Sequence, residues 1–385
     1  MGRGRFRTTE RVVKMINNVT ASAGDRQARA PRYSQVELNR SVDAHERFLR
    51  GEPRGQRAIW RYMQAPGCDF SRRLLQQSDL TGANLQGATL VDTSFERACL
   101  HFADLRAVDA ERASFVRADL RGVSVRHANL SGALFDGADL RQAVLSPRGT
   151  SQDFRLVETL GPAGPGAGDV VFEVDFSHCS MRRARLANAT LSGANFNGAL
   201  LADADLTGAD FRGASFNGAI LTGVRLDGAR IDPASLSHCL LDPSPEAVRR
   251  AVEVMARLAA SDRWVDSGGV DGGPAQLDGE DLRPLGAVFV GRRLTAVSAR
   301  RVCAVGMSFA GAQLQGGRFD DADLRDVDFT GADLRGASFR GARLRYAQFK
   351  DADMRPLPLA SGAAREVDLV GADYDESSLS SSRRT

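Results

Sequence analysis

The chain has 385 residues, of which 43% are hydrophobic, and its formal net charge is +3. The apolar content suffices for a packed interior, but no apolar run reaches the roughly 18 residues of a membrane-spanning helix, so no transmembrane helix is expected. Five cysteines are an odd number for a disulfide framework, and no apolar segment follows the basic N-terminus. We therefore expect a cytoplasmic protein.

Residues 1–33 form a basic arm. Residues 1–67 contain 14 basic and 6 acidic side chains, an excess that the rest of the chain does not share. One interpretation is a partly disordered, solvated arm, and the second is contact with nucleic acid or another acidic surface. The candidate contacts are Arg3, Arg5, Arg7, Arg11 and Lys14.

Residues 34–50 have the pattern of a helix. Ser34 and Glu37 have the spacing of a capping box. Four residues recur on one helical face: Leu38, Val42, His45 and Leu49. Because a repeat array exposes apolar interior at its ends, we expect this helix to cap the N-terminal end of the array that follows.

From residue 58 the chain repeats every five residues. A large apolar residue recurs at every fifth position, as at Leu324, Phe329 and Leu334, and Ala or Val usually lies two residues before it. A period of five fits neither a helix nor a flat strand, so the backbone must turn once per repeat, which is typical of a solenoid. Three blocks follow this pattern: 58–145, 174–241 and 287–379.

The phenylalanines indicate the size of one coil. Within the blocks they recur every twenty residues, as at Phe289, Phe309 and Phe329. Twenty residues are four pentapeptides, so a four-sided coil would stack these rings into internal columns, whereas a three-sided or five-sided coil would not. We therefore predict a square β-helix whose coils pair about 4.8 Å apart and form a single rod.

Two segments interrupt the array. Residues 146–173 include the sequence GPAGPGAG and shift the phase of the repeat, which predicts a loop that leaves the rod as a hairpin or as a flexible excursion. Residues 242–286 begin with a predicted helix, in which Ser244 is the N-cap and Pro245 the first helical residue.

We expect this helix, at 245–259, to pack against the rod through one apolar stripe. The stripe consists of Val248, Val252, Met255 and Leu258. An apolar stripe left in water would favour aggregation, and a helix of this length is marginal unless it packs against something. Its opposite face and the Gly-rich segment behind it would then be the least repetitive surface of the protein.

The repeats resemble the pentapeptide-repeat protein family, whose pattern is A(D/N)LXX. The resemblance implies an all-β fold, a right-handed quadrilateral parallel β-helix, here with a short N-terminal helical cap and two non-repeat insertions. The predicted divisions are a basic arm and cap at 1–57, repeat blocks at 58–145, 174–241 and 287–379, insertions at 146–173 and 242–286, and a polar tail at 380–385.

Two His–Cys pairs, at 178–179 and 238–239, are candidate metal ligands. They lie three coils apart, about 14 Å, too far to bind one zinc ion, and the two cysteines occupy inward positions of the repeat. No catalytic or nucleotide-binding motif occurs in a suitable context. The sequence therefore predicts no catalytic residue, no metal site and no cofactor.

Acidic residues recur at coil spacing on the outside of the predicted rod. Two such columns are Asp79, Asp119 and Asp139, and Asp333, Asp353 and Asp373. An acidic column could imitate DNA, but arginines follow two residues after several of its members: Arg121, Arg141, Arg335 and Arg355. We therefore expect a neutralised surface of ion pairs.

The sequence favours a non-enzymatic scaffold for protein–protein interaction. The alternative is a modulator of DNA gyrase or another DNA transaction, which the resemblance implies because the family includes fluoroquinolone-resistance proteins. The partner's identity is not predicted, and a homo-oligomer is left open. The candidate partner surface consists of Arg249, Arg250, Glu253, Arg257 and Trp264.

Overall fold

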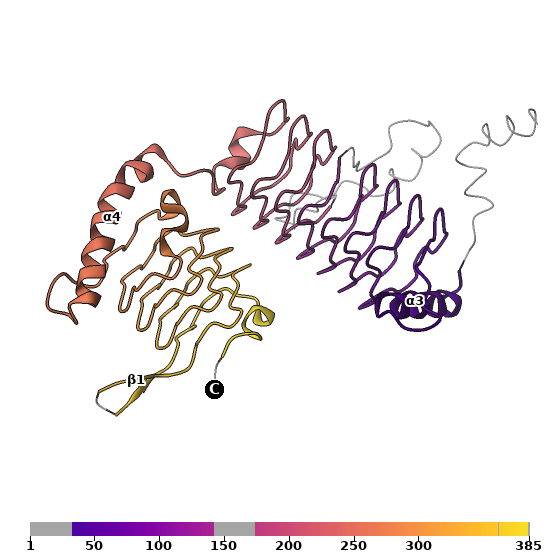
Figure 1. The fold of residues 1–385 in the computed structure, drawn as a ribbon. Helices are drawn as coiled ribbons and strands as arrows, with labels where there is room; N and C mark the ends of the chain where they lie inside the picture. Colours follow the sequence, from indigo (N-terminus) through magenta and orange to yellow (C-terminus); the bar gives the residue numbers. More distant parts are fainter. Residues whose placement is uncertain (1–32, 142–173, 361, 384–385) are drawn as a thin grey trace, which may run out of the picture. The chain divides into compact units, whose positions relative to one another are not determined.

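The computed structural model describes residues 33–141, 174–360 and 362–383 (Figure 1). The chain divides into two compact units, Met1–Asp242 (unit 1) and Pro243–Thr385 (unit 2). The first two repeat blocks lie in unit 1 and the third lies in unit 2. Between the second and third blocks the chain leaves the array after Asp242 and forms a long helix.

In unit 1 the chain returns to the same side every twenty residues. Isolated parallel β-bridges join residues twenty apart at four positions of each turn, as between Ile59 and Asp79. The predicted period and the four sides are thus confirmed. Each side contributes a single bridge rather than an extended strand, and the only named strands among the described residues are β1 (Leu357–Pro358) and β2 (Ala364–Arg365).

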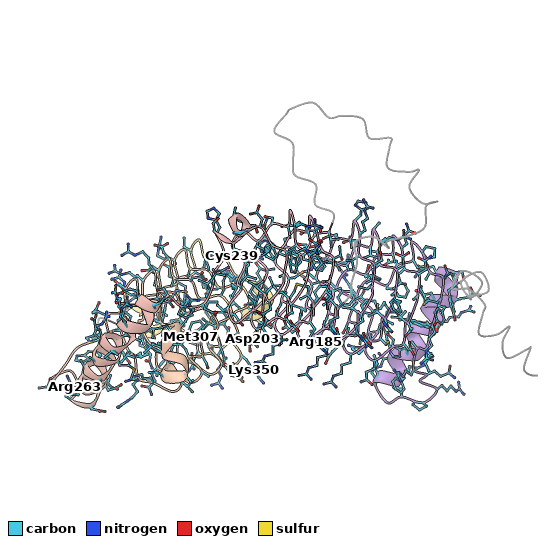
Figure 2. The ribbon with its side chains drawn as sticks, turned by 90° about the horizontal axis from the view of Figure 1, so that it is seen from above. Arg185, Asp203, Cys239, Arg263, Met307 and Lys350 are labelled. Carbon is cyan, nitrogen blue, oxygen red and sulfur yellow. The ribbon has the colours of Figure 1, made fainter. Side chains whose placement is uncertain are left out.

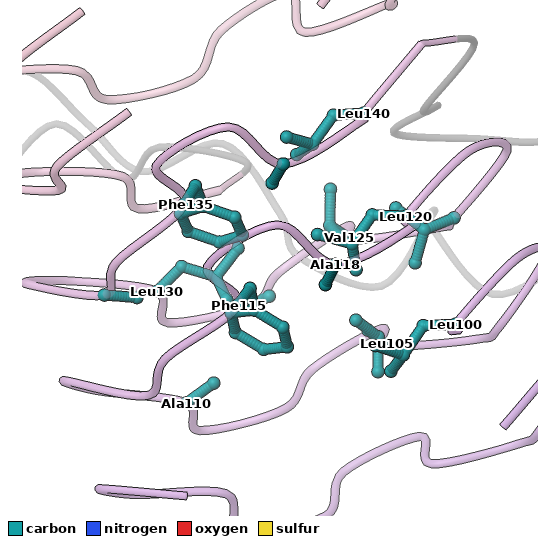
Figure 3. Packing of buried hydrophobic residues seen from close by; sticks show 14 of the residues in the cluster. Leu100, Leu105, Ala110, Phe115, Ala118, Leu120, Val125, Leu130, Phe135 and Leu140 are labelled. Atoms are coloured by element: carbon teal, nitrogen blue, oxygen red, sulfur yellow. The ribbon is translucent and has the colours of Figure 1, made fainter. Parts of the chain in front are cut away.

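The interior of each unit is a stack of apolar layers. The large residue of each pentapeptide and the small residue two positions earlier point inward and are buried, as for Leu120 and Ala118. The rings of Phe115 and Phe135 are stacked with their centroids 4.9 Å apart (Figure 3). The aromatic columns predicted from the twenty-residue spacing are therefore present in the core.

The corners between sides have positive φ. Glycine occupies many of these positions, for example Gly82 with φ 65°, since it adopts this region without steric cost. Tyr62 and Phe102 adopt the same conformation, with φ 59° and 56°. For an L-residue with a side chain this conformation is unfavourable by roughly 1–2 kcal/mol.

The first two blocks form one continuous stack. Asn129 bridges to Asp175, and the ring centroids of Phe135 and Phe176 lie 5.8 Å apart. The insertion between these blocks, including the expected excursion at 146–173, lies outside the described residues. The short 3₁₀ helix η2 (Pro233–Leu236) lies near the end of unit 1, and Leu240 after it still bridges to Ile220.

Helix α3 (Gln35–Leu49) covers the N-terminal end of unit 1, as predicted. Its N-cap Ser34 and Glu37 form both hydrogen bonds of a capping box. Leu38, Val42 and His45 are buried against the first coil. The Trp60 Nε1–H of that coil donates to the Ser41 hydroxyl of the helix, at 3.0 Å.

Unit 2 begins with helix α4 (Pro245–Asp266), and its first coil starts near Ala275 rather than at 287. The sequence missed this coil because its step is irregular: Gln276 bridges to Ser298, 22 residues on. Regular spacing resumes where Arg293 bridges to Gln313, so the extra residues lie in the 3₁₀ helix η3 (Arg283–Phe289).

A hairpin interrupts the later coils of unit 2. Strands β1 and β2 pair antiparallel and leave the array, so that Ser338 bridges to Asp368 and Arg343 bridges to Asp373. Asp373 therefore does not continue the column of Asp333 and Asp353, and that part of the predicted acidic column is wrong. The last coil closes with η4 (Glu376–Leu379), whose Leu379 is buried.

Candidate interaction surface

Helix α4 caps unit 2 in the way that α3 caps unit 1. The Ser244 hydroxyl accepts a hydrogen bond from the Ala247 N–H at 3.2 Å, as expected for an N-cap that precedes Pro245. Val254 and Leu258 are buried in the same hydrophobic cluster as the first coils of unit 2. The helix extends to Asp266, beyond the end near Ser261 that its sequence suggested.

The helix packs through a different face from the predicted one. Of the predicted stripe only Leu258 is buried, whereas Val248, Val252 and Met255 are 55%, 74% and 39% exposed. The reason is that α4 carries two neighbouring apolar stripes, and periodicity does not tell which of them meets the coil. The structure therefore leaves an apolar stripe of three residues, Val248, Val252 and Met255, in solvent; we call it the outer stripe.

Two arginines that were expected on the outer face are turned toward the coil. Arg250 and Arg257 form ion pairs with the same carboxylate, that of Glu280, at 2.6 and 2.7 Å. Arg257 also donates to the backbone carbonyl of Gln276 at 2.8 Å. Burial raises the pKa of Glu280, but the hydrogen bonds from the two guanidiniums outweigh it and leave the pKa below its ordinary value.

Ion pairs at the other end of α4 fix the helix to the next turn. Asp262 pairs with Arg292 at 2.6 Å, and Asp266 pairs with Arg293. Together with Glu280 these contacts surround the buried Val254 and Leu258 with charged partners. Because both ends of the helix are held, the outer stripe is presented on a rigid element.

The remaining candidates differ in their accessibility. Arg249 pairs with Glu246 on the solvent side, and Glu253 is exposed beside the outer stripe. Trp264 is half-buried where the chain folds back at Gly269 and Gly272. The outer face of α4 therefore consists of the outer stripe with Arg249 and Glu253, and the stripe is the part that the sequence assigned to the core.

The aspartate–arginine pairs of the outer walls are as predicted. Arg121 and Arg141 bind Asp119 and Asp139 with two hydrogen bonds or more each, at 2.6–3.2 Å. The Arg121 guanidinium, opposed by partial burial, holds the pKa of Asp119 below its ordinary value. Figure 2 shows charged side chains along the outside of the coils, Arg185 among them.

In several of these pairs the arginine side chain is more exposed than its aspartate. In the pair of Arg61 and Asp79, the arginine side chain is 63% exposed and the aspartate 10%. Arg335 is likewise more exposed than Asp333, and Arg212 is more exposed than Asp210. In other pairs the order is reversed, as for Asp323, which is more exposed than Arg325, so the walls present both guanidinium groups and carboxylates.

Both cysteines of the His–Cys pairs point inward. The Cys179 thiol is buried and donates to the Leu130 carbonyl at 2.8 Å, and the Cys239 thiol donates to the Phe216 carbonyl at 3.1 Å. Burial raises the pKa of both thiols, that of Cys239 to about 11. No cluster of three or more metal-ligating side chains occurs among the described residues.

The candidate residues of the basic arm all lie outside the described residues; they are Arg3, Arg5, Arg7, Arg11 and Lys14. No helix in the described part of the chain is long and apolar enough to cross a membrane.

Comparison with known proteins agrees with this geometry. The profile of the family described as pentapeptide repeats matches residues 68–146, 172–237 and 322–355 in overlapping segments. The chain is a pentapeptide-repeat protein. The matched pentapeptide repeats lie in both units, and α3 and α4 lie outside them. No curated protein sequence matches the chain at a significant level.

Several solved pentapeptide-repeat proteins are similar to the chain. HetL, a protein involved in heterocyst differentiation regulation from the cyanobacterium Nostoc sp. strain PCC 7120, is 19% identical; the match covers 85% of this chain and 98% of HetL, with a TM-score of 0.32. Full-length QnrB1, a plasmid-mediated fluoroquinolone resistance protein, is 17% identical over 83% of this chain and 85% of its own, with a TM-score of 0.16. These scores are too low for an inference about function.

Proposed function

We propose that the chain is a non-enzymatic scaffold whose outer stripe on α4 binds a protein partner. The observation that carries the proposal is the exposure of Val248, Val252 and Met255 on a helix whose other face is already packed. Their spacing of four and then three residues places them on one helical face. This is the pattern of an amphipathic helix that enters an apolar groove.

Charged residues flank the outer stripe. Glu253 and the pair of Arg249 with Glu246 flank it, so a partner groove needs apolar walls and a charged rim. Cap formation does not require an apolar outer face, because Val254 and Leu258 already fill the end of the coil. We attribute the exposure of these three apolar residues to partner binding.

A capture experiment with a matched control tests the proposal. Val252→Ser combined with Met255→Ser removes the stripe without touching the packed face. Val36→Ser changes an exposed valine on α3 and serves as the control. We expect a protein captured and cross-linked by the unaltered chain to be lost with the double variant and retained with the control. Equal capture by all three proteins would contradict the proposal.

The alternative, a DNA-gyrase modulator that imitates DNA, has less support. Imitation needs carboxylates on the outermost layer, whereas here guanidiniums such as Arg61 and Arg212 lie outside their aspartates. The projecting β1–β2 hairpin is the feature that favours a modulator. A supercoiling assay with purified gyrase decides between them, since the scaffold should leave supercoiling unchanged.

The finer fold and location belong to the same proposal. Both units would be right-handed quadrilateral β-helices, as the family implies, and the protein would act in the cytoplasm. The five cysteines form no disulfide, which suits a reducing compartment. The proposal leaves the partner open, including a second copy of the chain.

A further inference from the structure

One corner of unit 1 carries aromatic residues where its other corners carry no tyrosine or phenylalanine. Tyr62, Gly82, Phe102 and Gly122 are spaced by twenty, and each follows a residue of one bridge column by three positions. They therefore form one column along the outside of the first coils, which we call the aromatic corner. Phe102 is 62% exposed and Tyr62 is also exposed.

Glycines hold the two rings in place. A Cβ built at Gly122 would overlap the ring of Phe102, and one built at Gly82 would overlap the ring of Tyr62. Each ring therefore lies against bare backbone on the next coil. His101 stacks on Phe102 with the ring centroids 4.1 Å apart and the planes inclined by 21°. The two aromatic positions are two coils apart, about 10 Å.

The aromatic corner is unfavourable for folding. Phe102 has φ 56°, a conformation in which a bulky side chain is strained, and its ring gains little from burial. Glycine, as at positions 82 and 122 of the same column, would remove both costs. Positive φ is shared by other non-glycine corners, such as Arg72 and Arg112, so the distinguishing feature is the exposure of the two rings, which indicates a binding surface.

Arginines precede two positions of this column: Arg61 directly precedes Tyr62, and Arg121 directly precedes Gly122, against which Phe102 lies. The Arg61 Nε–H donates to Asp79 at 2.6 Å, and Arg121 binds Asp119 through Nε and Nη2 at 2.8 and 2.6 Å. In both pairs the arginine side chain is the more exposed partner. The guanidinium edges directed away from the aspartates can therefore meet an anion, although each pair is neutral as a whole.

We propose that the aromatic corner binds single-stranded nucleic acid, with bases stacked on Tyr62 and on the stacked rings of His101 and Phe102, and with phosphates at Arg61 and Arg121. Exposed rings interleaved with cations are the combination that single-stranded nucleic acids require, because bases offer flat faces and the backbone is anionic. A duplex hides its base faces and fits this surface poorly. An acidic protein would use the arginines but leave the rings without a partner.

This surface is separate from α4 and its outer stripe, so the proposal does not depend on the scaffold function. It also differs from the basic arm at 1–33, whose binding would need no aromatic ring. Variants of the rings in the full-length chain therefore distinguish the aromatic corner from the arm.

The test measures binding of a fluorescently labelled oligothymidylate of about 15 nucleotides by anisotropy. The decisive variants are Phe102→Gly and Tyr62→Gly, because glycine suits the positive φ and a loss of binding cannot be ascribed to misfolding. We expect Phe102→Gly to weaken binding about tenfold. Tyr346→Gly in unit 2, where Tyr346 has φ 66°, is the matched control and should bind as the unaltered chain does.

The contribution of charge to oligonucleotide binding is tested by measuring the affinity at several salt concentrations. Replacing the Arg121–Asp119 pair by Arg121→Gln with Asp119→Asn keeps the site neutral and removes one phosphate contact. The slope of log affinity against log salt should fall by about 0.7.

Four results would each overturn the proposal. The first is no binding by the unaltered chain, and the second is unchanged binding by both glycine variants, which would assign the interaction to the arm. The third is competition by polyglutamate as strong as that by unlabelled oligothymidylate, which would indicate an acidic protein surface. The fourth is equal affinity for a duplex of the same length.

Discussion

The two cap helices make the same kind of apolar contact but differ in the ion pairs around it, because α4 contributes both arginines and aspartates whereas α3 contributes carboxylates. Each buries two apolar residues in the end of a coil, Leu38 and Val42 from α3 and Val254 and Leu258 from α4. Around this contact α3 contributes carboxylates, those of Asp43 and Glu46, to Arg73 of its coil. Helix α4 instead contributes arginines, Arg250 and Arg257, to Glu280.

Their outer faces differ in a way that capping does not explain. The two large apolar residues most exposed on α3, Val36 and Phe48, lie twelve positions apart and form no stripe. On α4 the residues Val248, Val252 and Met255 share one face and are exposed. The comparison shows that a cap can have a polar outer face, so capping alone does not require the outer stripe on α4.

The largest effect should come from the core of unit 2. Leu334 is fully buried between Leu314 and Met354, as the bridges of their neighbours show. Leu334→Lys places an unpaired charge there and should destabilise unit 2 by several kcal/mol. Hydrogen exchange followed through denaturant unfolding should show unit 1 unaffected, because solenoid stability is mostly between neighbours.

Leu334→Met is the control for this change, since it conserves volume and should cost less than about 1.5 kcal/mol. A Leu334→Lys protein with unchanged exchange in unit 2 would contradict the inward position of Leu334.

A smaller effect is expected at the α4 cap. Glu280→Gln removes the charge that holds Arg250 and Arg257, and it should weaken the docking of α4 by about 1–2 kcal/mol. Faster hydrogen exchange in 245–266 would report this loss. Arg249→Gln, on the solvent side of the same helix, should leave the exchange rates nearly unchanged. Equal effects of the two variants would show that Glu280 does not anchor the helix.

Mild acid should destabilise the α3 cap but not the α4 cap. Burial lowers the pKa of His45 from its ordinary 6.5, although its hydrogen bond to Gln76 opposes this shift. The neutral ring accepts from the Ala58 N–H through Nδ1 at 3.0 Å. Its stabilising contribution is present above pH 6.5 and is lost as the pH falls from 6.5 toward the lower pKa of the folded state.

The carboxylate of Glu280 also has a lowered pKa, so its contribution persists until the pH falls below its ordinary 4.5. Between pH 7 and pH 5, amide protection factors, which correct for the slower intrinsic exchange at lower pH, should therefore fall in α3 but not in α4. A His45→Gln variant should remove this difference. The opposite order of loosening would contradict the assignment of His45 as a neutral anchor.

Much of the fold followed from the sequence because the repeat is regular. A period of five, with aromatic residues every twenty, leaves few ways to fill a four-sided interior, and Leu120, Phe115 and Phe135 lie as predicted. The capping box at Ser34 was equally readable, since it depends only on local spacing. Failures occurred where the spacing changes, as at Gln276 and at the hairpin.

The site was harder to predict than the fold. Two apolar stripes side by side on α4 give the same periodicity, and only the partner coil decides which one is buried. The turn of Arg250 and Arg257 toward Glu280 depends on a residue more than twenty positions away. The sequence does contain a signal for the aromatic corner. Tyr62 and Phe102 occupy a corner position that is often glycine, and they lie 40 residues apart, which is two coils.

The β1–β2 hairpin has a consequence for how such proteins diverge. Ten residues are looped out between Ser338 and Asp368, so every later residue lies half a turn from where uninterrupted counting would place it. The inward and outward alternation survives, because ten is a multiple of five. An insertion of one, two or three pentapeptides therefore shifts every later residue by one, two or three sides of the coil. The outer columns then gain new neighbours, whereas the inward residues stay inward.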